Sequence, residues 1–217
     1  MTESEAPGLE QLLATLGRTV RDRRVLEAIR SVPRPLFVPP GLRARSWENV
    51  ALPIGSGQTI SQPLVVARML ELLDLRGTER VLDVGTGSGY HAGLLAHLGG
   101  SVISVERHAR LSRQAAAALA AAGIGNVELV VGDGSLGLPE RAPFDAINVA
   151  AAGDLETLRE LGRQLAPDGR LVAPLAEDSG RTETQSLVLA RAGPGGVAAE
   201  RWEPVRFVPL ISGGPPG

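Results

Sequence analysis

Three glycines at alternate positions are the chain's first sign of a ligand site. Gly85, Gly87 and Gly89 lie in VLDVGTGSGY, between a short apolar run and residues with helical spacing. Glycine adopts positive φ angles freely and lets a ligand approach the backbone closely. A dinucleotide-binding loop needs its third glycine at the position of Tyr90, so a nicotinamide oxidoreductase is disfavoured. The spacing suits a cofactor without phosphates, such as S-adenosylmethionine; a plain strand-to-helix turn is the alternative.

Carboxylates and one further glycine follow the neighbouring predicted strands. Glu106 ends SVISVE, 21 residues after Gly85. At this position a carboxylate can accept hydrogen bonds from both hydroxyls of a ribose. Asp133 could accept from an adenine amino group and Gly134 could leave room for the ring, although Asp-Gly turns are common. Asp83 could face the cofactor's ammonium group or serve as a structural carboxylate. Together with the glycine loop, these positions favour S-adenosylmethionine as the cofactor.

Ser61 lies near the end of an uncharged stretch, LPIGSGQTISQP (residues 52–63), that the sequence predicts to be a loop. Ser61 stands where a helix N-cap belongs, with Pro63 in the first turn, so a purely structural role is one hypothesis. The other is chemical. A carboxylate, with a pKa of about 4, is ionised at neutral pH and can attack a sulfonium methyl without a general base. Such a reaction needs alignment, and the Ser61 hydroxyl, assisted by Thr59, could donate to one carboxylate oxygen and aim the other.

The spacing of apolar residues predicts a helical beginning, then alternating strands and helices, then two late strands. Helices are expected at residues 9–17, 23–32, 61–75, 90–99, 109–123 and 154–165. Strands are expected at residues 80–85, 101–106, 126–133, 144–150, 169–175, 182–191 and 203–210. This order predicts an α/β fold with a doubly wound, mostly parallel, Rossmann-like sheet. We expect one domain with an N-terminal helical and loop segment (1–60), a cofactor-binding core (61–176) and C-terminal strands bordering the substrate (177–211).

Composition excludes several classes of function. The 217 residues include no cysteine, so neither disulfides nor a thiolate nucleophile exist. The three histidines, His91, His97 and His108, lack metal-ligand spacing, so no metal site is expected. A net charge of −2 predicts no nucleic-acid partner, and no apolar run is long enough to predict a membrane span. The acidic N-terminus predicts no signal peptide, so we expect a cytoplasmic protein.

Seven stretches together resemble the protein-L-isoaspartate O-methyltransferase family. They are LPIGSGQTISQPLVVARMLELL, VLDVGTGSGYHAGLLA, VISVER, GDG, APFDAI, GRLVAPL and VRFVPL, in the family's order. The glycine loop is common to many methyltransferases, whereas GQTISQP and RFVPL are specific to this family. The resemblance implies methyl transfer from S-adenosylmethionine to the free α-carboxylate of L-isoaspartyl residues in damaged proteins. The ester recloses to a succinimide, whose hydrolysis returns some normal aspartate, so the implied role is protein repair.

The resemblance also implies roles for individual residues. Ser61 matches the family's active-site serine. Together with Asp83, the expected cofactor contacts are Gln58, Thr59, Ile60, Ser61, Gly85, Thr86, Gly87, Gly89, Glu106, Asp133 and Gly134. The expected substrate contacts are Thr59, Ser61, Phe207, Val208 and Pro209. The implied partners are isoaspartyl-containing proteins and peptides, and we expect the enzyme to be a monomer.

Three segments depart from the family's pattern, and all three are expected on the substrate side. Pro35 follows Arg34 where the family has histidine, and Trp47–Asn49 replaces a Tyr-x-Asp unit. Residues 150–158 contain none of the prolines usual there. Two other functions therefore stay open. One is a related methyltransferase that modifies normal aspartate in a dedicated peptide to form an aspartimide, and the other is a cofactor-binding module without turnover.

Overall fold

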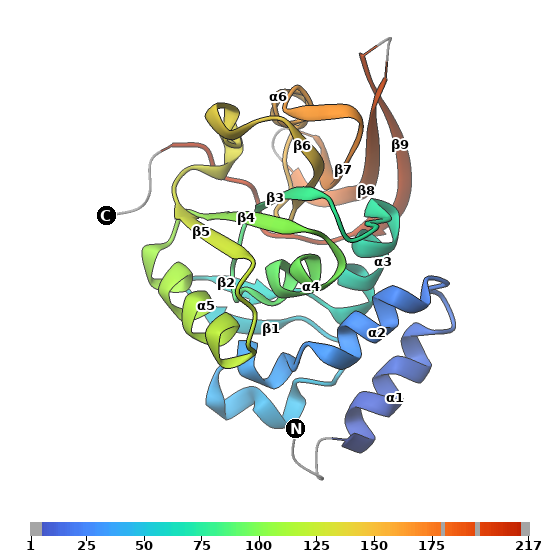
Figure 1. The fold of residues 1–217 in the computed structure, drawn as a ribbon, viewed down its shortest axis with the longest axis vertical. Helices are drawn as coiled ribbons and strands as arrows, with labels where there is room; N and C mark the ends of the chain where they lie inside the picture. The colour runs from blue at the N-terminus through green and yellow to red at the C-terminus, as the bar shows by residue number, and fades with distance from the viewer. Residues whose placement is uncertain (1–5, 179–180, 194–195, 214–217) are drawn as a thin grey trace.

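A seven-stranded sheet forms the centre of the computed structural model, which describes residues 6–178, 181–193 and 196–213 (Figure 1). The strand order is β5-β4-β3-β6-β7-β8-β9, in which β3 to β7 run parallel and β8 is antiparallel to both neighbours. The strands are β3 (Arg80–Val84), β4 (Ser101–Glu106), β5 (Val127–Val131), β6 (Phe144–Val149), β7 (Leu165–Asp178), β8 (Arg181–Gly193) and β9 (Gly196–Val205). The predicted α/β fold with a doubly wound, mostly parallel sheet is confirmed.

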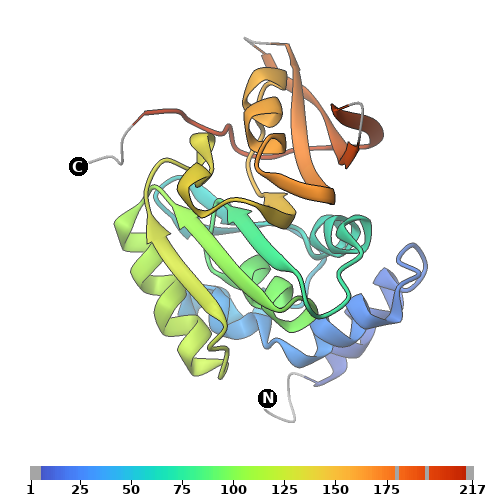
Figure 2. The same cartoon turned by 45° about the horizontal axis from the view of Figure 1, so that its top comes forward.

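Helices cover both faces of this sheet (Figure 2). They are α1 (Ala6–Leu16), α2 (Arg23–Ser31), α3 (Pro63–Leu73), α4 (Tyr90–Leu98), α5 (Ala109–Ala121) and α6 (Leu155–Gly162), with short 3-10 helices η1 (Arg34–Phe37), η2 (Pro40–Arg45), η3 (Gly134–Leu136) and η4 (Pro139–Arg141). Alternate strand residues point to opposite faces, so Val81 packs in the core layer of α1 to α5 while Leu82 packs in that of α6. The chain leaves β3 for β4 and β5, then returns to β6 on the other side of β3. This reversal places a ligand crevice at the carboxyl end of β3.

The predicted loop at residues 52–63 contains a small β-hairpin instead. Strands β1 (Leu52–Gly55) and β2 (Gln58–Ile60) pair antiparallel. Three successive residues in the turn have positive φ angles: 97° at Gly55, 52° at Ser56 and 70° at Gly57. Two of them are glycines, for which positive φ carries no steric penalty, so the G-S-G sequence permits this turn. The hairpin delivers Ser61 directly after a paired strand.

The last strand lies earlier in the chain than the sequence predicts. β9 spans Gly196–Val205, whereas a strand was expected at residues 203–210. After Val205 the chain leaves the sheet edge, and residues 206–213, here called the C-terminal segment, run back past the sheet toward β5 (Figure 1). A single parallel bridge, Ala152 to Pro209, ties this segment to the end of β6. The expected substrate-side residues therefore lie on an extended segment.

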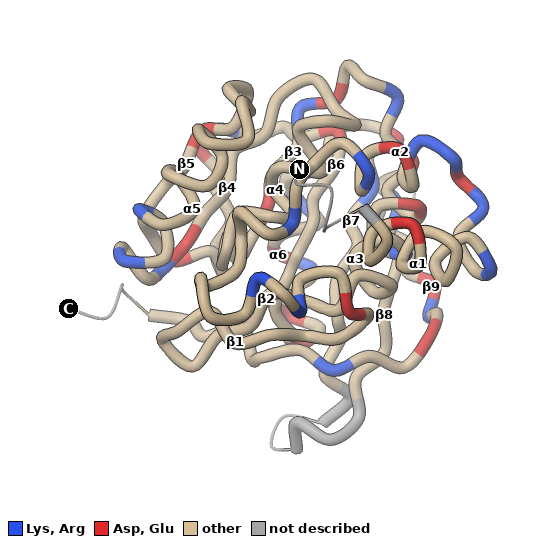
Figure 3. Tube along the Cα trace, turned by 90° about the horizontal axis from the view of Figure 1, so that it is seen from below, with Lys and Arg blue, Asp and Glu red and all other residues tan. Residues whose placement is uncertain are grey.

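Charged residues are interspersed along the chain. In the view from below, arginine positions are intermingled with Asp and Glu positions (Figure 3). Several form exposed ion pairs, such as Arg141 with Glu128 and Arg45 with Glu48. Within the ranges that the structure describes, no helix is both long and apolar enough to cross a membrane.

Candidate active site

A pocket of about 850 Å³, its open mouth included, lies at the carboxyl ends of β3, β4 and β6. Most of the predicted site residues line it: Gln58, Thr59, Ile60, Ser61, Gly85, Thr86, Gly87, Glu106, Gly134, Val208 and Pro209. They come from the hairpin, from loops after three parallel strands and from the C-terminal segment. Because parallel strands end at the same edge of a sheet, stretches far apart in sequence meet here. We call this the strand-end pocket.

Glu106 is held in a fixed position beside the glycine loop. Gly87 N–H donates to Oε2 at 2.8 Å and His108 N–H donates to Oε1 at 2.9 Å. The residue is buried, with 5% of its surface exposed. An ionised carboxylate has about four acceptor positions, so each oxygen keeps capacity for another donor. A ribose with two neighbouring hydroxyls matches this pair of oxygens. The positive φ angles of Gly85 and Gly87, 93° and 53°, shape the loop around it.

Asp83 lies beneath the pocket and does not line it. Its register partners on the neighbouring strands are Ser104 and Asn148, and both donate to its carboxylate at 2.7 Å. Thr86 Oγ1 lies 2.6 Å from Ser104 Oγ, which connects this buried row to the glycine loop. Burial raises the pKa of Asp83 to about 6. Of the two roles open for Asp83, the structure therefore supports the structural carboxylate over a direct contact with the cofactor.

Gly89 and Asp133 are two further predicted contacts that do not line the pocket. A Cβ on Gly89 would lie 2.9 Å from Ala115 Cβ, so this glycine lets α4 and α5 approach closely. Asp133 Oδ1 accepts from Ser135 N–H at 2.9 Å and caps η3, and its Oδ2 accepts from Gly213 N–H at 2.6 Å. Its carboxylate therefore stabilises the turn at η3 and holds the end of the C-terminal segment. Gly134 does line the pocket, and packing also requires it, because a Cβ there would lie 2.7 Å from Val84 Cγ1.

A second hollow adjoins the strand-end pocket on the side of the C-terminal segment. It measures about 1040 Å³ including open space, and we call it the C-terminal groove. Phe207 lines this groove and not the pocket. The residues that line both hollows are Thr59, Ser61, Ala150 and Val208. Ser61 thus stands where the pocket and the groove meet.

The N-cap hypothesis for Ser61 is wrong. Helix α3 has Gln62 at its N-cap, and Gln62 makes no side-chain capping bond. Instead Leu64 N–H donates to Asn49 Oδ1 at 3.0 Å, so a residue 15 positions away serves the first turn. The Ser61 carbonyl accepts from Arg34, whereas the Ser61 hydroxyl has no hydrogen bond among the described residues. The hydroxyl is therefore available at the junction of the two hollows.

Comparison with known proteins decides the family. A model of the protein-L-isoaspartate(D-aspartate) O-methyltransferase family matches residues 9–214. This chain belongs to that family. Protein-L-isoaspartate O-methyltransferase 1 of Rhodopseudomonas palustris strain HaA2 is 51% identical over 195 residues, 89% of this chain and 78% of the relative. The enzyme of Anaeromyxobacter dehalogenans strain 2CP-C is 53% identical over 192 residues, 88% of this chain and 90% of the relative.

Solved structures agree with the family assignment. One described as a protein-L-isoaspartate O-methyltransferase superposes with a TM-score of 0.82 at 28% identity, covering 95% of this chain and 67% of its own. A second, from Plasmodium falciparum and in complex with S-adenosyl-L-homocysteine, gives 0.78 at 26% identity, covering 93% and 97%. The chain is thus an S-adenosylmethionine-dependent protein carboxyl methyltransferase. The pocket fits this cofactor, because Glu106 keeps two acceptor positions for a ribose.

Arg34 holds the backbone that leads into and out of the β1–β2 hairpin at the methyltransferase site. It is fully buried, and its guanidinium donates to the carbonyls of Ser46 at 2.8 Å, Ser61 at 3.0 Å and Val50 at 3.4 Å. Its central carbon lies 5.0 Å from the centre of the Tyr90 ring. Burial lowers the pKa of Arg34 to about 10, so it stays charged at neutral pH. One side chain thereby fixes the backbone on both sides of the hairpin.

Arg34→Met is expected to lower the free energy of unfolding by about 3 kcal/mol, because it leaves buried carbonyls without donors. Urea unfolding monitored by circular dichroism measures the change. Arg45→Met is the matched control, since Arg45 is half exposed and, within the described part of the chain, forms an ion pair with Glu48 alone. The control should lose far less stability, because solvent screens an exposed ion pair and leaves it little net effect on folding. Equal losses in the two variants would contradict the role given to Arg34.

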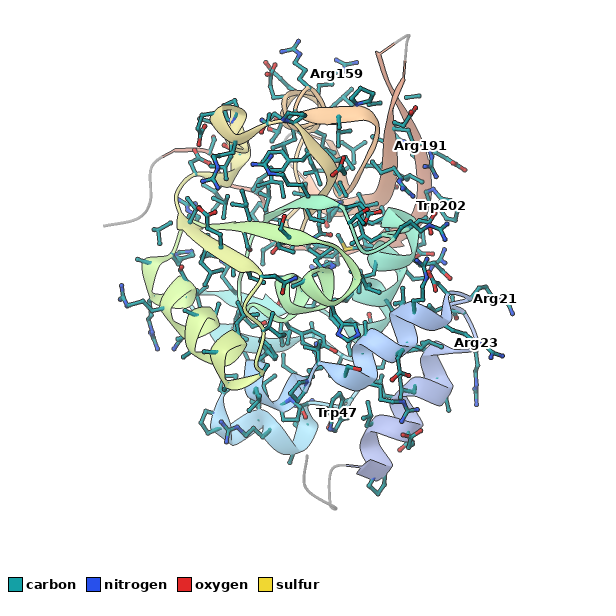
Figure 4. The ribbon with its side chains drawn as sticks, in the orientation of Figure 1. Arg21, Arg23, Trp47, Arg159, Arg191 and Trp202 are labelled. Atoms are coloured by element: carbon teal, nitrogen blue, oxygen red, sulfur yellow. The ribbon has the colours of Figure 1, made fainter. Side chains whose placement is uncertain are left out.

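The three departures from the family's pattern have different places. Trp47 is buried against Gly8 of α1, near the N-terminal helices, and Asn49 caps α3 (Figure 4). Pro35 is buried in η1. These two segments serve packing, so the expectation that they border the substrate is not supported. Residues 150–158 do reach the site, since Ala150 lines both hollows.

Several residues at the site were not predicted from the sequence. The strand-end pocket is also lined by Val66, Val84, Ser88, Tyr90, His91, Val105, Arg107, His108, Ala151, Leu210 and Ile211. Burial lowers the pKa of His91 to about 3, so its imidazole is neutral. Arg206 lines the C-terminal groove and brings a positive charge to it. In the sequence, only its position next to the predicted substrate contact Phe207 indicated that Arg206 could lie at the site. Among the described residues, no group of three acidic, histidine or cysteine side chains could hold a metal ion.

Proposed function

We propose that this site methylates the free α-carboxylate of L-isoaspartyl residues, and that Ser61 is the catalytic residue that orients this carboxylate. The place of Ser61 carries the proposal, because it lines both the strand-end pocket and the C-terminal groove. A methyl donor in the pocket and a peptide in the groove would meet at this residue. The positive charge of Arg206 on the groove favours an anionic substrate group.

For this methyl transfer, the main task of the protein is to position the carboxylate and the methyl donor. S-adenosylmethionine, when bound, supplies a methyl group on a positively charged sulfur. The nucleophile needs no base, because a carboxylate with a pKa of about 4 is already ionised at neutral pH. The Ser61 hydroxyl donates to one carboxylate oxygen and leaves the other free, and Thr59, on the same wall, assists. Glu106 would accept hydrogen bonds from the ribose hydroxyls of the methyl donor, and the glycine loop would help to hold it. Positioning of this kind contributes up to about 7–11 kcal/mol in favourable model reactions.

We also propose that the enzyme acts as a cytoplasmic monomer without nucleic-acid or membrane partners. The interspersed charges support the absence of a nucleic-acid partner (Figure 3). Light scattering at assay concentration tests the assembly, and a stable dimer there would contradict the proposal.

A pair of matched peptides tests the substrate assignment. The two peptides share one sequence and differ only in a normal aspartyl or an isoaspartyl linkage. Each is incubated with the enzyme and S-adenosylmethionine carrying a labelled methyl group, and base-labile label is counted as methyl ester. Selective labelling of the isoaspartyl peptide is expected. Labelling of neither peptide would sink the general repair function and point to a dedicated peptide, whereas preference for normal aspartate would identify the aspartimide-forming reaction.

A further inference from the structure

Gln185 holds the C-terminal segment through both halves of its side-chain amide. Phe207 N–H donates to Gln185 Oε1 at 2.7 Å, and Gln185 Nε2 donates to the Phe207 carbonyl at 3.0 Å. Only 2% of the Gln185 surface is exposed. The backbone ladder between β8 and β9 ends at the pair Gln185 and Val205. The side chain therefore continues the pairing after β9 has left the sheet, by offering one acceptor and one donor as a strand would.

The anchored segment forms a wall of both hollows. Phe207 and Val208 line the C-terminal groove, and Val208 to Ile211 line the strand-end pocket. The part of the segment that lines the strand-end pocket, the pocket half, is held by backbone hydrogen bonds. Ala152 N–H donates to the Val208 carbonyl and Leu210 N–H donates to the Ala152 carbonyl, both at 2.8 Å. Among the residues that the structure describes, Phe207 has no backbone partner of that kind, and only Gln185 bonds to its N–H and carbonyl. The groove half of the wall therefore depends on one side chain.

We propose that Gln185 is a positioning residue for the peptide substrate: by fixing Phe207, it sets the groove wall against which the isoaspartyl peptide is held beside Ser61. The inference rests on the proposed function, since it gives the groove to the peptide. Loss of Gln185 should weaken peptide binding and leave cofactor binding nearly unchanged, because the pocket half keeps its Ala152 anchor.

The chain contains a matched control. Gln164 makes the same kind of two-sided contact elsewhere: Leu138 N–H donates to its Oε1 at 2.9 Å, and its Nε2 donates to the Leu136 carbonyl at 2.8 Å. Gln164 is buried too, with 7% of its surface exposed. The loop that it holds lines neither hollow at these residues. Gln185→Leu and Gln164→Leu therefore remove equivalent contacts at different places.

Kinetics on the isoaspartyl peptide test the proposal in the full-length enzyme. Gln185→Leu is expected to raise the peptide KM about tenfold, while the Kd of S-adenosylhomocysteine from calorimetry stays within about threefold. Gln164→Leu should leave both within about twofold. Equal KM values for the two variants, or parallel loss of peptide and cofactor binding in Gln185→Leu, would overturn the proposal. Should Gln185→Leu fail to fold, Gln185→Glu keeps the acceptor for Phe207 N–H and loses the donor, and an unchanged KM there would also overturn it.

Hydrogen exchange separates this proposal from the proposed function. Mass spectrometry of residues 206–211 is expected to show faster amide exchange in Gln185→Leu than in the wild-type enzyme and in Gln164→Leu. Unchanged exchange in this segment would refute the anchoring by Gln185 whatever the substrate is. A wild-type enzyme that methylates neither peptide would refute the proposed function alone.

Discussion

Ser61→Ala is expected to lower kcat on an isoaspartyl peptide about 100-fold, the size of effect seen when one preorganised donor at a reacting group is removed. The Kd of S-adenosylhomocysteine should stay within about threefold, because the backbone that lines the pocket is unchanged. The Ser61 hydroxyl has no hydrogen bond among the described residues, so its removal leaves no partner unpaired. The free energy of unfolding should therefore change by less than about 0.5 kcal/mol. Steady-state assays at saturating substrates and urea unfolding give these quantities.

Asn49→Ala is the matched control, because Asn49 makes the capping bond to α3 that Ser61 does not make. This variant should lose about 1 kcal/mol of stability and keep kcat within about threefold. The account would be wrong if the two variants exchanged behaviour. A Ser61→Ala enzyme with full turnover and a stability loss of about 1 kcal/mol would return Ser61 to a capping role.

Glu106→Ala is expected to raise the Kd of S-adenosylhomocysteine at least about 100-fold. Hydrogen bonds to a charged group contribute about 1.5–3 kcal/mol each, and a ribose offers two hydroxyls to this carboxylate. The substitution also releases Gly87 N–H, which Glu106 holds at 2.8 Å in the glycine loop. Isothermal titration calorimetry measures the affinity, and circular dichroism confirms that the variant is folded.

Glu128→Ala serves as the control for charge alone. Glu128 pairs with Arg141 at the surface, half exposed, and lines neither hollow. Its replacement should leave the Kd within about twofold. A Glu106→Ala enzyme that binds S-adenosylhomocysteine as tightly as Glu128→Ala would rule out the ribose contact.

The elements that place the cofactor were predictable because their signals are local. Each strand of the parallel core is a short apolar run, and the residues that follow β3, β4 and β5 were expected at one edge of the sheet. Gly85, Glu106 and Gly134 lie there. Their roles as cofactor contacts stay predictions, and the Glu106→Ala variant tests that of Glu106.

Residues whose roles depend on distant partners could not be assigned from the sequence. The Asp83 carboxylate is bound by Ser104 and Asn148, which lie opposite it on the neighbouring strands. These two residues come next to Asp83 only when the sheet has formed. The capping group of α3 comes from Asn49, so the local pattern around Ser61 and Pro63 misled. The hairpin at residues 52–60 is too short to show a clear alternation.

The end of β9 shows the same limit. VRFVPL has the composition of a strand, and its residues do extend, yet they leave the ladder after Val205. What fixes them is the Gln185 side chain and the backbone of Ala152, from two other parts of the chain. The sequence predicted that these residues are extended. Whether they pair in the sheet or line the pocket depends on tertiary contacts, which the local sequence does not show.

Alignment without a general base is tested most directly by the pH dependence of a single turnover. Enzyme saturated with S-adenosylmethionine is mixed with isoaspartyl peptide, and methyl ester is quantified after rapid acid quench between pH 7.0 and 8.5. The buried groups near the site have pKa values of about 6 at Asp83, about 10 at Arg34 and about 3 at His91, all outside this range. The rate is predicted to stay constant within about twofold, because the attacking carboxylate is already ionised. A rate that rises about tenfold per pH unit would show that a proton must leave first, and would contradict the mechanism.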